Sequence, residues 1–114
     1  MLRILFWAAC AFAFVMAVVP HPPILPGHPS DKLQHIAAFV VLAVLGRLAY
    51  PETKKRKLLL GLMAFGALIE IVQAIPPLHR DADPLDWLAD TGAALTVFVI
   101  VALWGYLTAR RRAR

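Results

Sequence analysis

Residues 70–92 read EIVQAIPPLHRDADPLDWLADTG, and this stretch decides how the chain folds. It begins with a carboxylate inside an apolar run, is interrupted by Pro76 and Pro77, and ends where another apolar run begins. It also holds five of the chain's seven acidic residues. Because a proline pair stops a helix, the stretch predicts two apolar helices joined by a polar connection.

The composition of the whole chain is typical of a protein that lies in a bilayer. Hydrophobic residues make up 61% of the 114 residues, and the mean hydropathy is +0.70. A soluble protein this small could not cover so much apolar surface. We therefore predict a single membrane domain comprising residues 1–114. The single cysteine, Cys10, excludes an internal disulfide and a cysteine-based zinc site.

Four apolar runs predict transmembrane helices at about residues 4–19, 33–50, 58–75 and 91–107. The first run has a second interpretation as a signal peptide, because Val15-Met16-Ala17 resembles a small-residue cleavage site. The later runs favour a retained helix. Five prolines exclude a helix from residues 20–30. The fold class predicted is an all-α membrane protein with an up-down-up-down bundle.

The basic residues predict the orientation of this bundle. Ten of the twelve Lys and Arg residues fall on one side of the predicted membrane, including Lys54–Lys57 and the arginine-rich tail. By the positive-inside rule, both termini are cytoplasmic in a multi-pass inner-membrane protein. Residues 20–32 and 76–90 then face outward. The basic blocks lie beside apolar runs and form no recognisable binding module, so we predict the lipid bilayer as a partner and no nucleic acid.

This topology brings a set of polar residues to a similar depth near the outer face. An ionisable group at the depth of Glu70 costs several kcal/mol if lipid surrounds it, so it should face the bundle. We predict Glu70 and His35 as an acid–base pair. The predicted binding residues are Asp31, Lys32, Gln73, Arg80, Asp83 and Asp86.

Two interpretations of these polar residues stay open. In one, they form an ion-paired knot that fixes the register of the helices. In the other, they line a pocket in which Arg80 and Lys32 hold an anionic head group and His35 with a carboxylate exchanges protons. His35 with Glu70, Asp83 and Asp86 could bind a divalent ion, but this residue set is not diagnostic. The sequence favours neither a metal ion nor another cofactor.

Three motifs in this region resemble the VanZ-like family of small integral membrane proteins. They are Asp31-Lys32-x-x-His35, Glu70-x-x-Gln73 and Arg80-x-x-Asp83-x-x-Asp86, within a similarity that spans about residues 30–105. The resemblance implies a four-helix membrane protein with these polar residues as its shared core. The family commonly has an Asn where this chain has Asp90, and Gly92 comes slightly early. The family's namesake is associated with reduced susceptibility to teicoplanin, but nothing in this chain specifies antibiotic resistance.

Three functional hypotheses follow from these observations. The first is a protein that binds or modifies an anionic envelope lipid or glycolipid in a pocket at the extracytoplasmic face. The second is a non-catalytic membrane scaffold or partner protein, in which the polar residues only lock the bundle. The third, a proton-coupled transporter, is disfavoured because no pair of broken helices is evident. The sequence does not decide between an enzyme and a binding protein.

Overall fold

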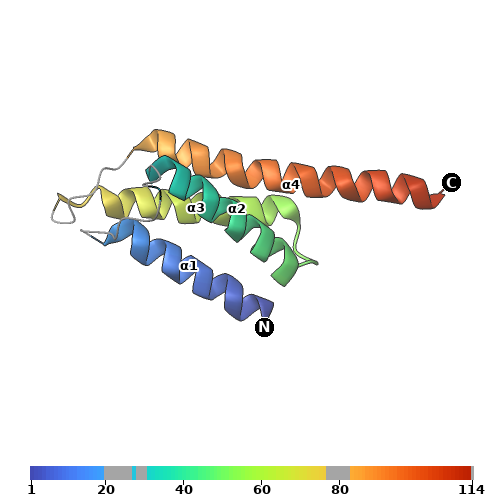
Figure 1. Cartoon of the computed structure of the whole chain (residues 1–114), viewed down its shortest axis with the longest axis horizontal. Helices are drawn as coiled ribbons and strands as arrows, with labels where there is room; N and C mark the ends of the chain where they lie inside the picture. The colour runs from blue at the N-terminus through green and yellow to red at the C-terminus, as the bar shows by residue number, and fades with distance from the viewer. Residues whose placement is uncertain (20–26, 28–30, 77–82, 114) are drawn as a thin grey trace.

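The computed structural model describes residues 1–19, 27, 31–76 and 83–113 of the chain. Its regular structure consists of four helices, shown in Figure 1: α1 (Leu2–Val18), α2 (Asp31–Ala49), α3 (Lys55–Gln73) and α4 (Pro84–Ala113). These residues contain no strand. The predicted all-α fold class is therefore confirmed.

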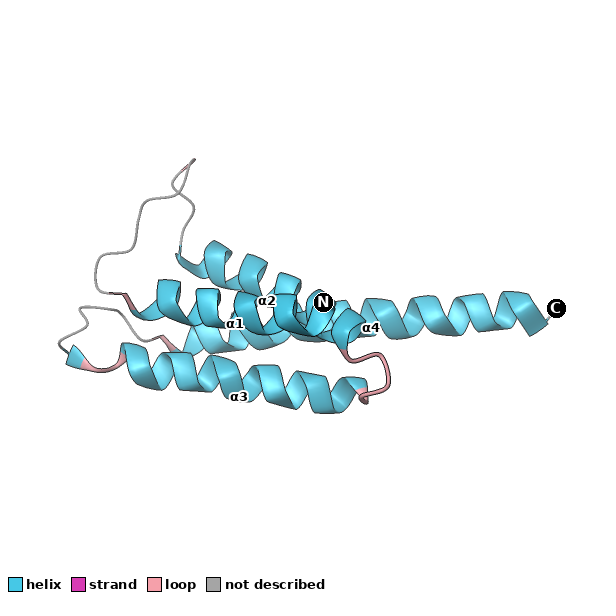
Figure 2. Ribbon diagram, turned by 90° about the horizontal axis from the view of Figure 1, so that it is seen from below, coloured by secondary structure: helices cyan, strands magenta, loops and turns pink. Residues whose placement is uncertain are grey.

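Successive helices run in opposite directions, so both ends of the chain lie toward the same end of the bundle (Figure 1). The helices α2 and α3 pack against each other and against both other helices. The helices α1 and α4 flank this central pair on opposite sides (Figure 1). From below, α1 lies in front of α4, with α2 and α3 on either side of it (Figure 2). The predicted order of antiparallel helices thus agrees with the arrangement in space.

Two of the four described helices are long and apolar enough to cross a membrane, α2 over Lys32–Ala49 and α4 over Pro84–Ala113. The apolar runs predicted four such helices. The helix α1 is apolar but has only 17 residues. The helix α3 carries Lys55, Arg56 and Lys57 in its first turn and Glu70 near its end, which shortens its uncharged part.

The helix α4 is much longer than the predicted range of residues 91–107. Its start is explained by Asp83, whose side-chain Oδ1 accepts a hydrogen bond of 2.9 Å from the backbone N–H of Leu85. Pro84 occupies the first helical position, where its missing N–H is not needed. Hydropathy identified only the apolar middle of the helix, whereas the polar residues at both ends are also helical. The 30 residues span about 45 Å, and α4 extends beyond the other three helices (Figure 1).

The best-buried side chains lie where α2, α3 and α4 meet. Phe39 and Leu42 of α2 and Ile69 of α3 are each at most 2% exposed. Small residues such as Gly66 and Ala94 face this core and let the helices approach closely. This contact positions the end of α3 beside the first turns of α4, where most of the predicted polar residues lie.

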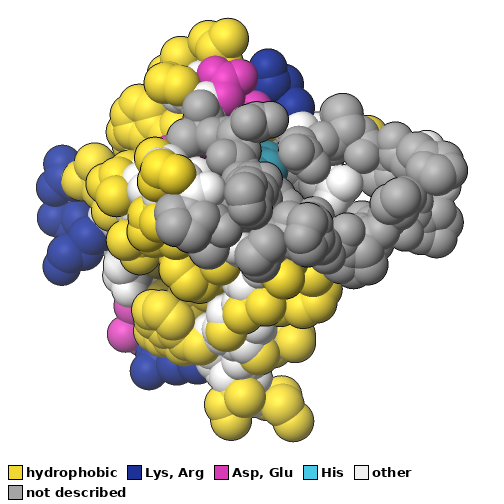
Figure 3. All heavy atoms as spheres, turned by 90° about the vertical axis from the view of Figure 1, so that its left-hand side faces the viewer, with side chains coloured by type: hydrophobic (Ala, Val, Ile, Leu, Met, Phe, Trp, Pro, Cys, Tyr) yellow, Lys and Arg dark blue, Asp and Glu magenta, His cyan; other side chains and the backbone are white. Residues whose placement is uncertain are grey.

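Large hydrophobic side chains are exposed on all four helices, among them Trp7, Val41, Leu68 and Trp104. Viewed from the end at which α2 and α4 begin, hydrophobic side chains make up most of the described surface, with charged side chains in a few separate groups (Figure 3). The exposed hydroxyl of Thr96 donates a hydrogen bond of 2.7 Å to the carbonyl of Gly92 in its own helix. The outer surface of the helices is therefore mostly apolar. The hydroxyl of Thr96 is satisfied by a carbonyl of its own helix and needs no hydrogen bond to water.

Candidate functional site

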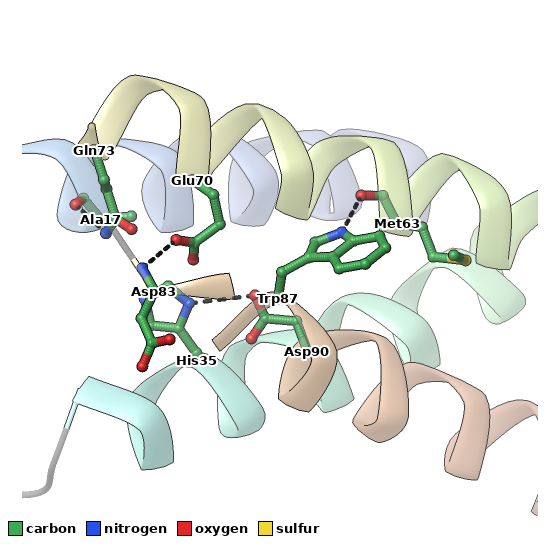
Figure 4. A network of polar contacts seen from close by, with 8 residues as sticks. All are labelled: Ala17, His35, Met63, Glu70, Gln73, Asp83, Trp87 and Asp90. Atoms are coloured by element: carbon green, nitrogen blue, oxygen red, sulfur yellow. Dashed lines mark hydrogen bonds and ion pairs between the residues drawn. The ribbon is translucent and has the colours of Figure 1, made fainter. Parts of the chain in front are cut away.

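The polar side chains of three helices converge at one end of the bundle (Figure 4). His35 lies near the start of α2, Glu70 in the last turn of α3 and Asp90 in the first half of α4. One nitrogen or oxygen atom from each of these side chains lies within 4.8 Å of the other two. We call these three residues the polar cluster.

His35 is paired with Asp90 in this cluster. The His35 Nδ1 and Asp90 Oδ2 atoms lie 3.3 Å apart, and the two residues are 8% and 1% exposed. The sequence predicted Glu70 as the partner of His35 and assigned no role to Asp90. A sequence signal for Asp90 did exist, because Asp86 and Asp90 are four residues apart and therefore share one face of a helix. Both prove to be buried.

Glu70 joins the end of α3 to the start of α4. Its Oε2 atom accepts a hydrogen bond of 2.8 Å from the backbone N–H of Asp83. The other carboxylate oxygen, Oε1, is buried, as is Oδ1 of Asp90, and neither has a hydrogen-bond donor among the described residues. Buried polar atoms in folded proteins nearly always have a partner. Two unpartnered carboxylate oxygens in one cluster are therefore a feature that a function should explain.

Gln73 and Asp86 are also buried, but their positions differ. Gln73 turns toward α1, where its side-chain Nε2 donates a hydrogen bond of 2.8 Å to the carbonyl of Ala17 (Figure 4). That carbonyl belongs to the last turn of α1, where the helix itself supplies no N–H partner. Gln73 therefore attaches α1 to α3. Asp86, in contrast, lies in the first turn of α4, where negative charge is favourable.

Of the four remaining predicted binding residues, the structure describes the side chains of two. Lys32 is exposed in the first turn of α2, and Asp83 is half-buried just before α4. Asp31 begins α2, but its side chain lies outside the described part of the structure, as does the whole of Arg80. Among the described residues at this end, four carboxylates accompany a single lysine. The buried carboxylates therefore favour a cation or a proton beside them, whereas an anion would lie nearer the exposed Lys32.

An apolar cavity of about 680 Å³ lies between α1 and α2, close to the polar cluster. Ala13 of α1, Val41 of α2 and Ile69 of α3 contribute to its walls, and His35 lines it as well. The cavity opens on the outside of the bundle, because Phe12 and Val41 are both lining residues and exposed. His35 thus belongs both to an apolar cavity and to the polar cluster.

No family model, curated protein or solved structure matches this chain. The VanZ-like resemblance therefore stays a prediction from the motifs. Any function proposed for the chain rests on the geometry of the cavity and of the polar cluster.

Replacing Gln73 with methionine is expected to loosen α1. The substitution keeps the volume of the side chain but removes the donor to Ala17, which leaves a carbonyl unpaired at a cost of about 1–3 kcal/mol. We expect faster amide hydrogen exchange in the last two turns of α1 and unchanged exchange in α4. Thr96→Ala, which removes a hydroxyl bonded only within α4, serves as the control. Equal exchange rates of α1 in the parent and in Gln73→Met would contradict the proposed role of Gln73.

Proposed function

We propose that this chain is a VanZ-like inner-membrane protein that binds an anionic envelope lipid or glycolipid at the extracytoplasmic end of its bundle. In this proposal, all four helices cross the membrane and both termini are cytoplasmic. The apolar outer surface of the helices supports a bilayer environment. The concentration of Lys and Arg near the termini and the α2–α3 turn supports the orientation.

The observation that carries the lipid hypothesis is the apolar cavity that shares His35 with the polar cluster. A lipid is an amphiphile, and this arrangement offers each part of it a suitable environment. An acyl chain would lie in the cavity against Ala13, Val41 and Ile69. The head group would lie at the polar end, near the exposed Lys32, while Arg80, predicted from the sequence to bind it, is outside the described residues. The volume of about 680 Å³ is in the range of small-molecule sites.

A second function, a non-catalytic membrane scaffold, is supported by the side-chain contacts between helices. Gln73 joins α3 to α1, the pair of His35 and Asp90 joins α2 to α4, and the indole N–H of Trp87 in α4 donates a hydrogen bond of 2.9 Å to the carbonyl of Met63 in α3. Together these contacts link all four helices. A scaffold needs this rigidity, but it does not need an open cavity.

Filling the cavity is expected to abolish selective lipid binding. Ala37 is exposed and lines the cavity, so Ala37→Phe places a ring where the acyl chain would lie with little strain on the core. Native mass spectrometry of protein extracted with its own lipids should show a defined anionic lipid on the parent. We expect at least a roughly tenfold lower bound fraction for Ala37→Phe, since an occupied cavity excludes the chain.

The matched control is Ala11→Phe, the same substitution at an exposed alanine of α1 that does not line the cavity. It should retain the lipid. Arg80→Ala tests the head-group end and should also lower the bound fraction. Equal and non-selective lipid carry-over by the parent and Ala37→Phe would overturn the lipid hypothesis in favour of the scaffold.

A further inference from the structure

The polar cluster has the composition of a metal site, and one pair of its potential ligand atoms has the spacing of one. His35, Glu70 and Asp90 come from three different helices and bring one imidazole and two carboxylates together. The potential ligand atoms lie within 4.8 Å of one another. Two ligand atoms that each lie about 2.0–2.1 Å from a tetrahedral Zn²⁺ ion are about 3.3 Å from each other. The His35 Nδ1 and Asp90 Oδ2 atoms already have this separation of 3.3 Å.

The unpartnered oxygens are an independent observation that points to a cation. Asp90 is only 1% exposed, yet its Oδ1 atom has no hydrogen-bond donor in the described part of the chain, and the same holds for the buried Oε1 atom of Glu70. Two carboxylates held this close repel each other, and a protonated His35 would offset only one of them. A divalent ion would neutralise both carboxylates and coordinate the oxygens that lack a partner.

We propose that His35, Glu70 and Asp90 bind a divalent transition-metal cation, for which Zn²⁺ is the best fit. An imidazole nitrogen with two carboxylate oxygens suits Zn²⁺ better than Mg²⁺ or Ca²⁺, which prefer all-oxygen ligands. The ion takes the place of the hydrogen bond between His35 Nδ1 and Asp90 Oδ2. The backbone N–H of Asp83 holds Glu70 Oε2, which leaves Oε1 as the coordinating atom and orients this ligand.

Three protein ligands leave one coordination position open on a tetrahedral ion. Because His35 also lines the apolar cavity, a water molecule or an oxygen of a molecule in the cavity can occupy that position. The site itself does not depend on the proposed lipid binding. The sequence favoured no metal because His35 with Glu70, Asp83 and Asp86 is not a diagnostic ligand set. In the structure, Asp90 takes the place of Asp83 and Asp86 in that set.

The test is a titration of the purified protein in detergent, stripped by a chelator, with Zn²⁺ and separately with Co²⁺. We expect one Zn²⁺ per chain and a visible Co²⁺ absorption of a four-coordinate site. Asp90→Asn and Glu70→Gln each remove a charged ligand and should weaken Zn²⁺ binding at least roughly tenfold. Glu52→Gln makes the same change in net charge at the opposite end of the bundle and should bind as the parent does.

A folded parent that takes up no stoichiometric Zn²⁺ would overturn the proposal without any variant. Equal Zn²⁺ affinity of the parent and Asp90→Asn would overturn it as well, because it would place the ion elsewhere. Thermal unfolding of each metal-free variant separates a lost ligand from a lost fold. The outcome is also separable from lipid binding, since Ala37→Phe fills the cavity but keeps all three ligands and should still bind Zn²⁺.

Discussion

Gly66→Leu is expected to disrupt the packing of the bundle and to cause a large loss of stability. A Cβ atom at this position would lie 3.1 Å from Cδ1 of Trp87 and 3.4 Å from Cζ of Phe39. Both neighbours are rings in the interior contact of α3 with α4 and α2. The further carbons of leucine have no space, so α3 must move away from both helices.

Overpacking a core costs about 1–3 kcal/mol where neighbours can adjust, and more where they cannot. Here the shift also pulls Trp87 from its hydrogen bond to the carbonyl of Met63 and disturbs Asp90, whose Oδ2 atom would lie 3.6 Å from the new Cβ. We therefore expect a loss of about 3 kcal/mol or more, a large part of the stability of a domain of this size. Thermal unfolding followed by circular dichroism in detergent measures the change.

Gly61→Leu is the matched control for this experiment. Gly61 lies in the same helix and is exposed, and a Cβ atom added there would have no described atom of a neighbouring element within 4 Å. Because leucine favours a helix more than glycine by about 0.5–1 kcal/mol, the control should be as stable as the parent or slightly more stable. Similar unfolding temperatures for the two leucine variants would show that α3 does not approach its neighbours closely at Gly66.

His35→Leu is expected to cost about 3–5 kcal/mol in the metal-free protein, because it removes the side chain that pairs with a buried carboxylate and leaves that charge in a medium of low polarity. The charge left behind is the carboxylate of Asp90, which is buried and has His35 as its side-chain partner in the described structure. The expected result is a much lower unfolding temperature with little change in helix content below it.

The same substitution should cost less when Asp90 is also neutral. In His35→Leu with Asp90→Asn, neither member of the pair is charged, so the double variant should be more stable than the sum of the two single effects predicts. We expect a coupling free energy of about 1–3 kcal/mol from this double-mutant cycle. Strictly additive effects would mean that the distance of 3.3 Å between His35 and Asp90 has no energetic significance.

Both substitutions act on one region, because Gly66 lies directly beside the polar cluster. The close approach of α3 to α4 at Gly66 brings the Asp90 carboxylate near the helix that carries Glu70. A bulkier residue would widen the distance between these two carboxylates. The packing of the core and the geometry of the site are therefore set by the same contact.

Local sequence patterns correctly predicted the number of helices and the end of the bundle at which the polar residues gather. Apolar runs, prolines and blocks of charge are local features, and helix formation responds to them within a few residues. The bounds of α4 were predicted least well. Its ends are polar, so hydropathy missed them, although Asp83 and Pro84 carry the capping signal that explains the start.

Which side chains meet depends on how the helices pack against one another. From its place in α2, His35 could face Glu70 or Asp90, and a small rotation of a helix about its axis exchanges one partner for the other. That rotation depends on how side chains from different helices interlock, here Gly66 against Trp87 and Phe39. The cavity between α1 and α2 likewise exists only once α1 is in place. Such contacts join residues far apart in the chain, so no local pattern specifies them.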